Sequence, residues 1–160
     1  VVFNLLSERG LIVSTAESCT GGQLAARIIS IPGASKIFER GYVTYSNRAK
    51  IEELAVSEQT LTKYGAVSRE TAMEMLKGLI KKTKSQVCVA ITGIAGPDGG
   101  TPEKPVGLVY IAAGLHNQLV CRSYELMGNR ERIQNDACLR ALDIVRRLIL
   151  KMELTGRHEA

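Results

Sequence analysis

Residues 87–101 run Val-Cys-Val-Ala-Ile-Thr-Gly-Ile-Ala-Gly-Pro-Asp-Gly-Gly-Thr, an apolar segment followed at once by a glycine-rich loop. The apolar part, 87–91, has the pattern of a buried strand. Four glycines and a proline in 92–101 are poor material for packing, because glycine costs backbone entropy unless a positive φ or a close approach requires it. Ligands of α/β sheets bind at the carboxyl ends of strands. We therefore predict that this loop lies against a small substrate, with its N–H groups turned toward it.

Strand and helix patterns alternate along the rest of the chain. We predict strands over 11–16, 36–45, 87–91, 106–115 and 119–126, and helices over 1–9 and 23–30, after Asn47, from Ser57 and Ser68, and from Asn129 to about Met152. A tight turn at His116-Asn117 imposes one antiparallel pairing. The predicted fold is a three-layer α/β/α sandwich with a mixed, mostly parallel sheet of about five strands. One domain is expected over 1–154, and 155–160 is expected to be a disordered tail.

Composition and charge narrow the class of partner. The net charge of +5 is spread among acidic residues, and two Phe, five Tyr and no Trp leave little aromatic surface for stacking bases. We therefore expect no nucleic-acid partner. Since no apolar run approaches membrane-spanning length, we expect no membrane partner either. A mild positive charge suits a small anionic substrate such as a nucleotide.

Cysteine and histidine usage limits the chemistry. The four cysteines show neither CxxC pairing nor the spacing of a disulfide framework, which predicts a reduced, cytoplasmic protein. Of the two histidines, His116 falls in the predicted turn and His158 in the polar tail. These positions argue against a histidine-ligated metal and against a Ser-His-Asp triad.

Ser18 is the first candidate for chemistry, because it lies on a polar turn between a strand and a helix. Thr20, Gly21 and Gly22 follow it, and the unpaired N–H groups of the helix N-terminus are predicted to face whatever binds above them. Ser18 is then either a nucleophile with backbone donors for an oxyanion or a simple helix N-cap. The local pattern leaves both open, and it equally leaves Glu17 as an orienting carboxylate or a salt-bridge partner.

Four further residues attract attention, each beside an ordinary structural explanation. Lys50, five residues after Tyr45 at a strand end, is either a partly desolvated base or a surface lysine. Thr92 ends the buried strand. Either its hydroxyl faces the glycine loop or it is an ordinary β-branched strand residue. Arg130 opposes the helix dipole in the first turn of the last helix, so it either meets an anion or pairs with an acidic neighbour.

Five motifs together resemble the C-terminal domain family of the competence/damage-inducible protein CinA. They are Thr15-Ala-Glu-Ser-Cys-Thr-Gly-Gly22, Gly41-Tyr-Val-Thr-Tyr-Ser-Asn-Arg-Ala-Lys50, Gly65-Ala-Val-Ser68, the loop 92–101 and Lys104-Pro-Val-Gly107. The stand-alone form of this domain is a nicotinamide-nucleotide amidase. The resemblance therefore implies hydrolysis of nicotinamide mononucleotide to nicotinate mononucleotide and ammonia, in pyridine nucleotide salvage, by a homodimer or higher homo-oligomer without cofactor or metal.

The same resemblance implies roles for individual residues. Ser18 would be the nucleophile, Lys50 the general base and Tyr45 the residue that relays or positions the proton. The residues expected to bind substrate are Thr20, Gly21, Gly22, Thr92, Gly93, Gly96, Gly99, Gly100 and Arg130, the last of these meeting the phosphate. The sequence departs from the family at Gln134, where a second basic residue is common. The alternative from another class is a non-catalytic nucleotide-binding sensor of the same fold.

Overall fold

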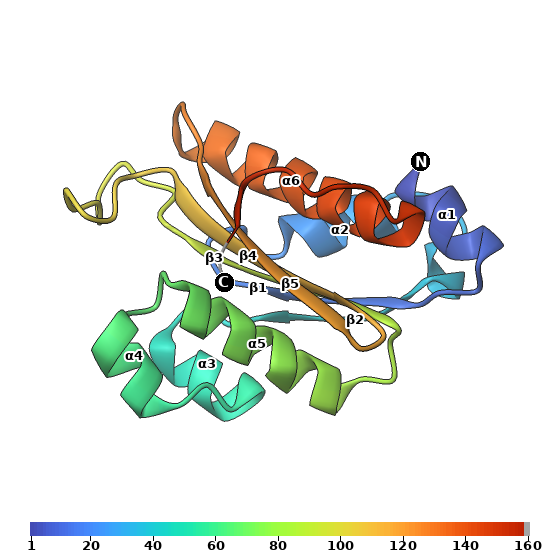
Figure 1. Cartoon of the computed structure of the whole chain (residues 1–160), viewed down its shortest axis with the longest axis horizontal. Helices are drawn as coiled ribbons and strands as arrows, with labels where there is room; N and C mark the ends of the chain where they lie inside the picture. The colour runs from blue at the N-terminus through green and yellow to red at the C-terminus, as the bar shows by residue number, and fades with distance from the viewer. Residues whose placement is uncertain (159–160) are drawn as a thin grey trace.

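The computed structural model describes residues 1–158 and places helices on both faces of one sheet (Figure 1). The strands are β1 (Val13–Glu17), β2 (Phe38–Val43), β3 (Val87–Gly93), β4 (Leu108–Leu115), β5 (Gln118–Glu125) and β6 (Arg157–His158). The helices are α1 (Val2–Glu8), α2 (Gln23–Ile29), the 3-10 turn η1 (Ala34–Lys36), α3 (Asn47–Leu54), α4 (Glu58–Tyr64), α5 (Arg69–Lys82) and α6 (Arg130–Leu150).

The sheet has the strand order β2-β1-β3-β4-β5-β6. β1 pairs in parallel with β2 and with β3, whereas β4, β5 and β6 each run antiparallel to the strand before them. The tight β4–β5 turn contains His116 with a positive φ of 52°. The predicted three-layer mixed sheet is confirmed, with its parallel part in β2-β1-β3 and with one more short strand than expected.

Two apolar layers hold the helices against the sheet. α1, α2 and α6 cover one face, and α3, α4 and α5 cover the other (Figure 1). Within β3, Val87, Val89 and Ile91 face the first layer, while Cys88 and Ala90 face the second. Because both faces of this strand are covered, its sequence is apolar without alternation.

Two local expectations are wrong. The helix expected after Asn47, with Asn47 as its cap, begins at Asn47 itself: Ser46 caps α3, since its hydroxyl accepts a hydrogen bond from the Ala49 N–H. In the tail, residues 155–158 are ordered against β5: the Tyr124 hydroxyl donates to the Thr155 carbonyl, and Arg157 forms an ion pair with Glu125. These contacts explain β6, which a short polar segment does not reveal on its own. Residues 159 and 160 of the predicted tail lie outside the described residues.

The parallel strands end at one edge of the sheet. β1 finishes at Glu17, β2 at Val43 and β3 at Gly93, and these ends are neighbours in the strand order. The segments that follow them carry Ser18, Tyr45 and the glycine loop. The fold thus brings together three of the stretches singled out in the sequence.

Candidate active site

A cavity of about 270 Å³ lies at this edge of the sheet. Its walls come from the β1–α2 turn, the β2–α3 segment, the loop before α5, the glycine loop and the first turn of α6. The lining residues are Ser18, Cys19, Tyr45, Lys50, Ala66, Val67, Thr92, Gly93, Ile94, Ala95, Gly96, Asp98, Gly99 and Arg130. All three predicted catalytic residues are among them.

Ser18 is held by the strand before it and by an unusual helix cap. Its N–H donates to the Ile91 carbonyl at 3.0 Å, which continues the β1–β3 pairing by one residue. The buried Glu17 carboxylate accepts hydrogen bonds from the Thr20 hydroxyl at 2.6 Å and from N–H groups at the start of α2, those of Gly22, Leu24 and Ala25.

Glu17 therefore caps the start of α2 in place of a serine N-cap. Of the two alternatives left open for this carboxylate, the structure favours an orienting role. The Ser18 hydroxyl is free of capping and faces the cavity, where Lys50 meets it.

Lys50 lies in the first turns of α3 and is only 1% exposed. Its Nζ is 2.9 Å from Ser18 Oγ, 2.9 Å from the Thr44 carbonyl oxygen and 3.1 Å from the Tyr45 carbonyl oxygen. Within residues 1–158, no Asp or Glu forms an ion pair with it. Burial lowers the pKa of Lys50 from 10.5 to about 8, with the Cys19 thiol acting in the opposite direction.

These three neighbours also suit an uncharged amine. A neutral amine has two N–H donors and one lone pair. The two carbonyls can take the two N–H groups, which leaves the lone pair directed at the Ser18 hydroxyl. Lys50 is accordingly placed to take a proton from Ser18.

The Tyr45 side chain, expected to relay or position the proton, contacts Arg130. This side chain is 62% exposed, and its hydroxyl accepts a hydrogen bond from Arg130 at 3.3 Å. Tyr45 contacts Lys50 through its backbone carbonyl, which accepts a hydrogen bond from Nζ. The physical reason is that β2 is the edge strand, so the side chain leaving its end lies over the rim of the cavity.

Arg130 connects three walls of the cavity. Its guanidinium donates to the Gly96 carbonyl at 2.7 Å and to the Tyr45 hydroxyl. Neither Asp98 nor Glu131, the acidic neighbours considered from sequence, is its hydrogen-bond partner. The positive charge is therefore fixed by neutral acceptors at the cavity edge, and no acidic side chain among residues 1–158 forms an ion pair with it.

Gln134 lies one turn further along α6. Its side-chain N–H donates to the Cys19 carbonyl at 2.8 Å, and its side-chain oxygen accepts from Gln23 at 3.0 Å. The Gln134 amide thus ties α6 to the serine turn and to α2.

The predicted substrate-binding residues divide into two groups. Thr92, Gly93, Gly96, Gly99 and Arg130 line the cavity. Thr20, Gly21, Gly22 and Gly100 are not part of its lining. The reason for the first three is that their polar groups are used internally, on Glu17 and on the Ser18 carbonyl. Gly100 instead packs so tightly against Val106 that an added Cβ would lie 2.8 Å from the Val106 backbone nitrogen.

Sequence reasoning missed the wall formed by Ala66 and Val67. These residues precede α5, and the Thr92 hydroxyl donates to the Ala66 carbonyl at 2.7 Å. The available signal was the motif Gly65-Ala-Val-Ser68, which carries no reactive side chain. Cys19 also lines the cavity, but it is buried, and desolvation raises the pKa of its thiol to about 12. It is therefore an unreactive thiol.

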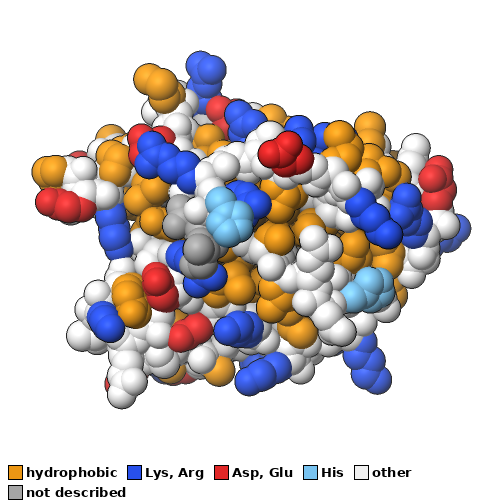
Figure 2. All heavy atoms as spheres, in the orientation of Figure 1, with side chains coloured by type: hydrophobic (Ala, Val, Ile, Leu, Met, Phe, Trp, Pro, Cys, Tyr) orange, Lys and Arg blue, Asp and Glu red, His pale blue; other side chains and the backbone are white. Residues whose placement is uncertain are grey.

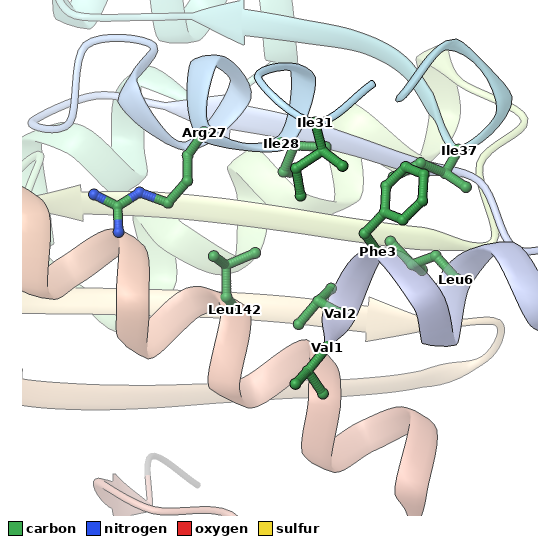
Figure 3. A pocket seen from close by; sticks show the side chains of 9 residues that line it. All are labelled: Val1, Val2, Phe3, Leu6, Arg27, Ile28, Ile31, Ile37 and Leu142. Carbon is green, nitrogen blue, oxygen red and sulfur yellow. The ribbon is translucent and has the colours of Figure 1, made fainter. Parts of the chain in front are cut away.

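A second cavity, of about 220 Å³, lies between α1, α2 and α6 (Figure 3). Apolar side chains such as Phe3, Ile28 and Leu142 line it, and the Arg27 guanidinium extends toward α6, where it donates to the Asn135 side chain. The side chains that line it include no nucleophile or base, so the cavity at Ser18 is the candidate active site.

The surface and the side-chain clusters bear on other kinds of site. On the face seen in Figure 2, Lys and Arg side chains are interspersed with acidic and apolar ones. Among residues 1–158, no three His, Cys, Asp or Glu side chains are grouped so as to hold a metal ion. No helix in the same residues is both long and apolar enough for a membrane span.

The fold and the site define a class of α/β protein with a serine–lysine pair at the carboxyl ends of parallel strands. Comparison with known proteins identifies the family: the CinA C-terminal domain matches residues 1–149, and the chain belongs to that family.

Two curated relatives illustrate the likeness. A CinA-like protein of Kosmotoga olearia is 49% identical over 152 residues, which cover 95% of this chain and 37% of that protein. A putative competence-damage inducible protein of Acetivibrio thermocellus is 51% identical over 153 residues, covering 96% of this chain and 37% of that protein. The chain thus spans little more than a third of the length of these relatives.

Solved structures share the fold over more than nine-tenths of the chain. The competence/damage inducible protein CihA of Agrobacterium tumefaciens superposes with a TM-score of 0.90 at 42% identity, covering 92% of this chain and 90% of that one. A CinA superfamily protein of Klebsiella pneumoniae gives a TM-score of 0.90 at 32% identity, covering 94% of both chains.

Proposed function

We propose that this domain hydrolyses the carboxamide of nicotinamide mononucleotide, giving nicotinate mononucleotide and ammonia. The observation that carries the proposal is the 2.9 Å contact between Ser18 Oγ and the Nζ of Lys50, a buried lysine with no carboxylate partner among residues 1–158. A hydroxyl paired with a base of lowered pKa is an activated nucleophile, and carboxamides are attacked by such groups.

The reaction would proceed in two stages. In the first, Ser18 Oγ bonds to the carboxamide carbon, its proton passes to neutral Lys50, and the carbonyl π electrons move to the oxygen. Collapse of this tetrahedral intermediate breaks the C–N bond, and the proton on Lys50 leaves with the nitrogen as ammonia. In the second stage, water attacks the ester, gives its proton to Lys50, and releases the acid as Ser18 recovers its hydrogen.

Specificity for a nucleotide would come from the cavity's edge. Arg130 offers a cation fixed by the Gly96 carbonyl and the Tyr45 hydroxyl, in the lining of the same cavity as the reacting pair. A phosphate is recognised well by a guanidinium. Gly96 and Gly99 carry no side chains, so the loop wall can approach the ribose closely. Tyr45 would position Arg130 and close the rim.

The test is ammonia release from nicotinamide mononucleotide by the purified protein, with Ser18→Ala and Lys50→Met beside it. We expect turnover in the parent protein and loss of turnover in both variants. Thr83→Ala is a matched control, because Thr83 ends α5 and does not line the cavity.

A calorimetric titration in parallel separates catalysis from sensing. Nucleotide binding without ammonia release in the parent protein would contradict the amidase and support the sensor. The predicted homo-oligomer and cytoplasmic location remain part of this proposal; the four buried free thiols suit a reducing compartment.

A further inference from the structure

Along β3, the N–H and C=O groups of successive residues point alternately toward β4 and toward β1. Ile94 N–H donates to the Leu108 carbonyl at 2.9 Å, and His116 N–H donates to the Gln86 carbonyl at 2.9 Å. These two bonds place the even-numbered residues of β3 in the hydrogen-bonded pairs with β4. On the other side, Val87 N–H donates to Ile12 and the Ile91 carbonyl accepts from Ser18, so the odd-numbered residues face β1.

Gly93 is the last residue of β3 and faces β1 by this alternation. Continued pairing would give its N–H the carbonyl of Ser18. β1, however, has ended at Glu17, and the Ser18 carbonyl accepts from Gly21 N–H at 3.1 Å instead. Within residues 1–158, the Gly93 N–H is therefore left without a protein acceptor, although it sits beside Ser18 in the lining of the cavity.

Two of the donors that follow Ser18 are already in use. Gly21 N–H donates to the Ser18 carbonyl and Gly22 N–H to the Glu17 carboxylate. From the sequence, the turn after Ser18 was expected to supply donors for an oxyanion. These two N–H groups instead form hydrogen bonds within the turn. The Gly93 N–H is a further backbone donor at the cavity, and it comes from the neighbouring strand.

Position 93 also tolerates no side chain. A Cβ there would lie 2.7 Å from Val109 Cγ2 and 2.9 Å from the Leu108 carbonyl oxygen, and both belong to the adjoining strand β4. A substitution would push β3 away from β4 and carry the amide out of position. Glycine at this site therefore keeps the N–H beside Ser18.

We propose that the Gly93 backbone N–H is an oxyanion donor of the site. The assignment rests on the proposed amidase function. As Ser18 Oγ bonds to the carboxamide carbon and its proton passes to Lys50, negative charge gathers on the former carbonyl oxygen. The Gly93 N–H is free to donate to that oxygen without giving up a bond made in the resting protein. Such preorganised donors stabilise the transition state more than the ground state.

The direct test replaces one backbone atom. The full chain is assembled by chemical ligation at the native Cys88, with glycolic acid in place of Gly93, so that an ester oxygen replaces the N–H and no side chain is added. The all-amide chain made by the same route is the reference. A chain with glycolic acid in place of Gly156, an exposed glycine in the segment that pairs with β5, is the matched control.

We expect kcat for ammonia release to fall by roughly 10²–10³-fold in the Gly93 ester, as for the loss of one oxyanion donor, with little change in KM. The melting temperature should stay near that of the reference, because the missing N–H has no acceptor among residues 1–158. The Gly156 ester should keep full activity.

The outcomes separate the two proposals. A Gly93 ester with the kcat of the reference overturns the oxyanion assignment and leaves the amidase standing. A reference chain that releases no ammonia overturns the amidase, and the assignment falls with it.

A second measurement needs no variant. In protein labelled with ¹⁵N-glycine, an analogue of the substrate with a formyl group in place of the carboxamide would add to Ser18 as a hemiacetal. The Gly93 amide proton should then move downfield as its new hydrogen bond forms. An adduct that leaves this proton unshifted contradicts the assignment, even if the ester variant fails to fold.

Discussion

Replacing Lys50 by methionine should separate the catalytic value of this lysine from its cost to stability. Burial holds the pKa of Lys50 at about 8, against 10.5 for a free side chain. The unfolded chain therefore binds more protons at this residue than the folded protein does between these two values. The contribution of Lys50 to the stability of the parent protein therefore rises with pH across this window, and this contribution is absent from Lys50→Met.

The size of the effect follows from the two pKa values. From pH 7 to pH 9 the linkage relation gives the parent protein at most about 1.4 kcal/mol of added stability from Lys50 alone. The cavity opens to solvent, which weakens the desolvation, so we expect about 1 kcal/mol. Other titrating groups contribute to both proteins and cancel in the comparison.

The assay is urea denaturation of both proteins at pH 7 and pH 9. The free energy of unfolding of the parent should gain about 1 kcal/mol relative to Lys50→Met over this interval. Equal pH dependence in the two proteins would refute the account, because Lys50 would then titrate alike in the folded and unfolded states and would not be a neutral base near pH 8.

Three further predictions address activity and stability. The kcat/KM of the parent should rise with pH and level off above the Lys50 pKa of about 8, since only the neutral amine accepts the Ser18 proton; a profile that falls from pH 6 to pH 9 would count against Lys50 as the base. Arg130→Gln should raise KM for nicotinamide mononucleotide roughly 10–100-fold, as for loss of a charged hydrogen bond, but scarcely change KM for the riboside that lacks the phosphate; an equal effect on both would exclude a phosphate contact. Glu17→Ala should lower the free energy of unfolding in urea by roughly 3 kcal/mol or more, because the Thr20 hydroxyl and three N–H groups of the helix start lose their acceptor; a loss below 1 kcal/mol would show that Glu17 does not hold the turn.

Much of the fold is contained in local patterns. The unalternating run 87–91 indicates a strand covered on both faces, and the helix starts at Ser57 and Ser68 are confirmed by their capping hydrogen bonds. The strand that pairs through 157–158 was not predictable in this way, because it depends on contacts with β5 that are distant in sequence.

The site was predictable as a meeting of segments but not in its internal geometry. Ser18 and Lys50 could be selected by residue type and by their places after strands. Whether Ser18 capped the helix depended on Glu17, whose side chain reaches four donors on the following turn and helix. The orientation of Tyr45 depended on β2 being an edge strand, which only the sheet order decides.

The glycine loop also combines a feature that the sequence predicts with one that it does not. From sequence, its glycines predict a wall that a ligand can approach closely, and Gly96 and Gly99 do line the cavity. The distinct position of Gly93 emerges only from the strand register, which turns its N–H toward the space that β1 leaves at Ser18. Backbone direction at a strand end is not encoded by residue type.

The central claim is that Ser18 carries the acyl group during turnover. The most direct measurement is intact-protein mass spectrometry on samples quenched in acid within the first turnovers of nicotinamide mononucleotide. The account predicts a protein species heavier by the acyl group of nicotinate mononucleotide, mapped by proteolysis to the peptide that contains Ser18 and absent from Ser18→Ala. Steady ammonia release by Ser18→Ala, or an acyl group mapped to another residue, would contradict it.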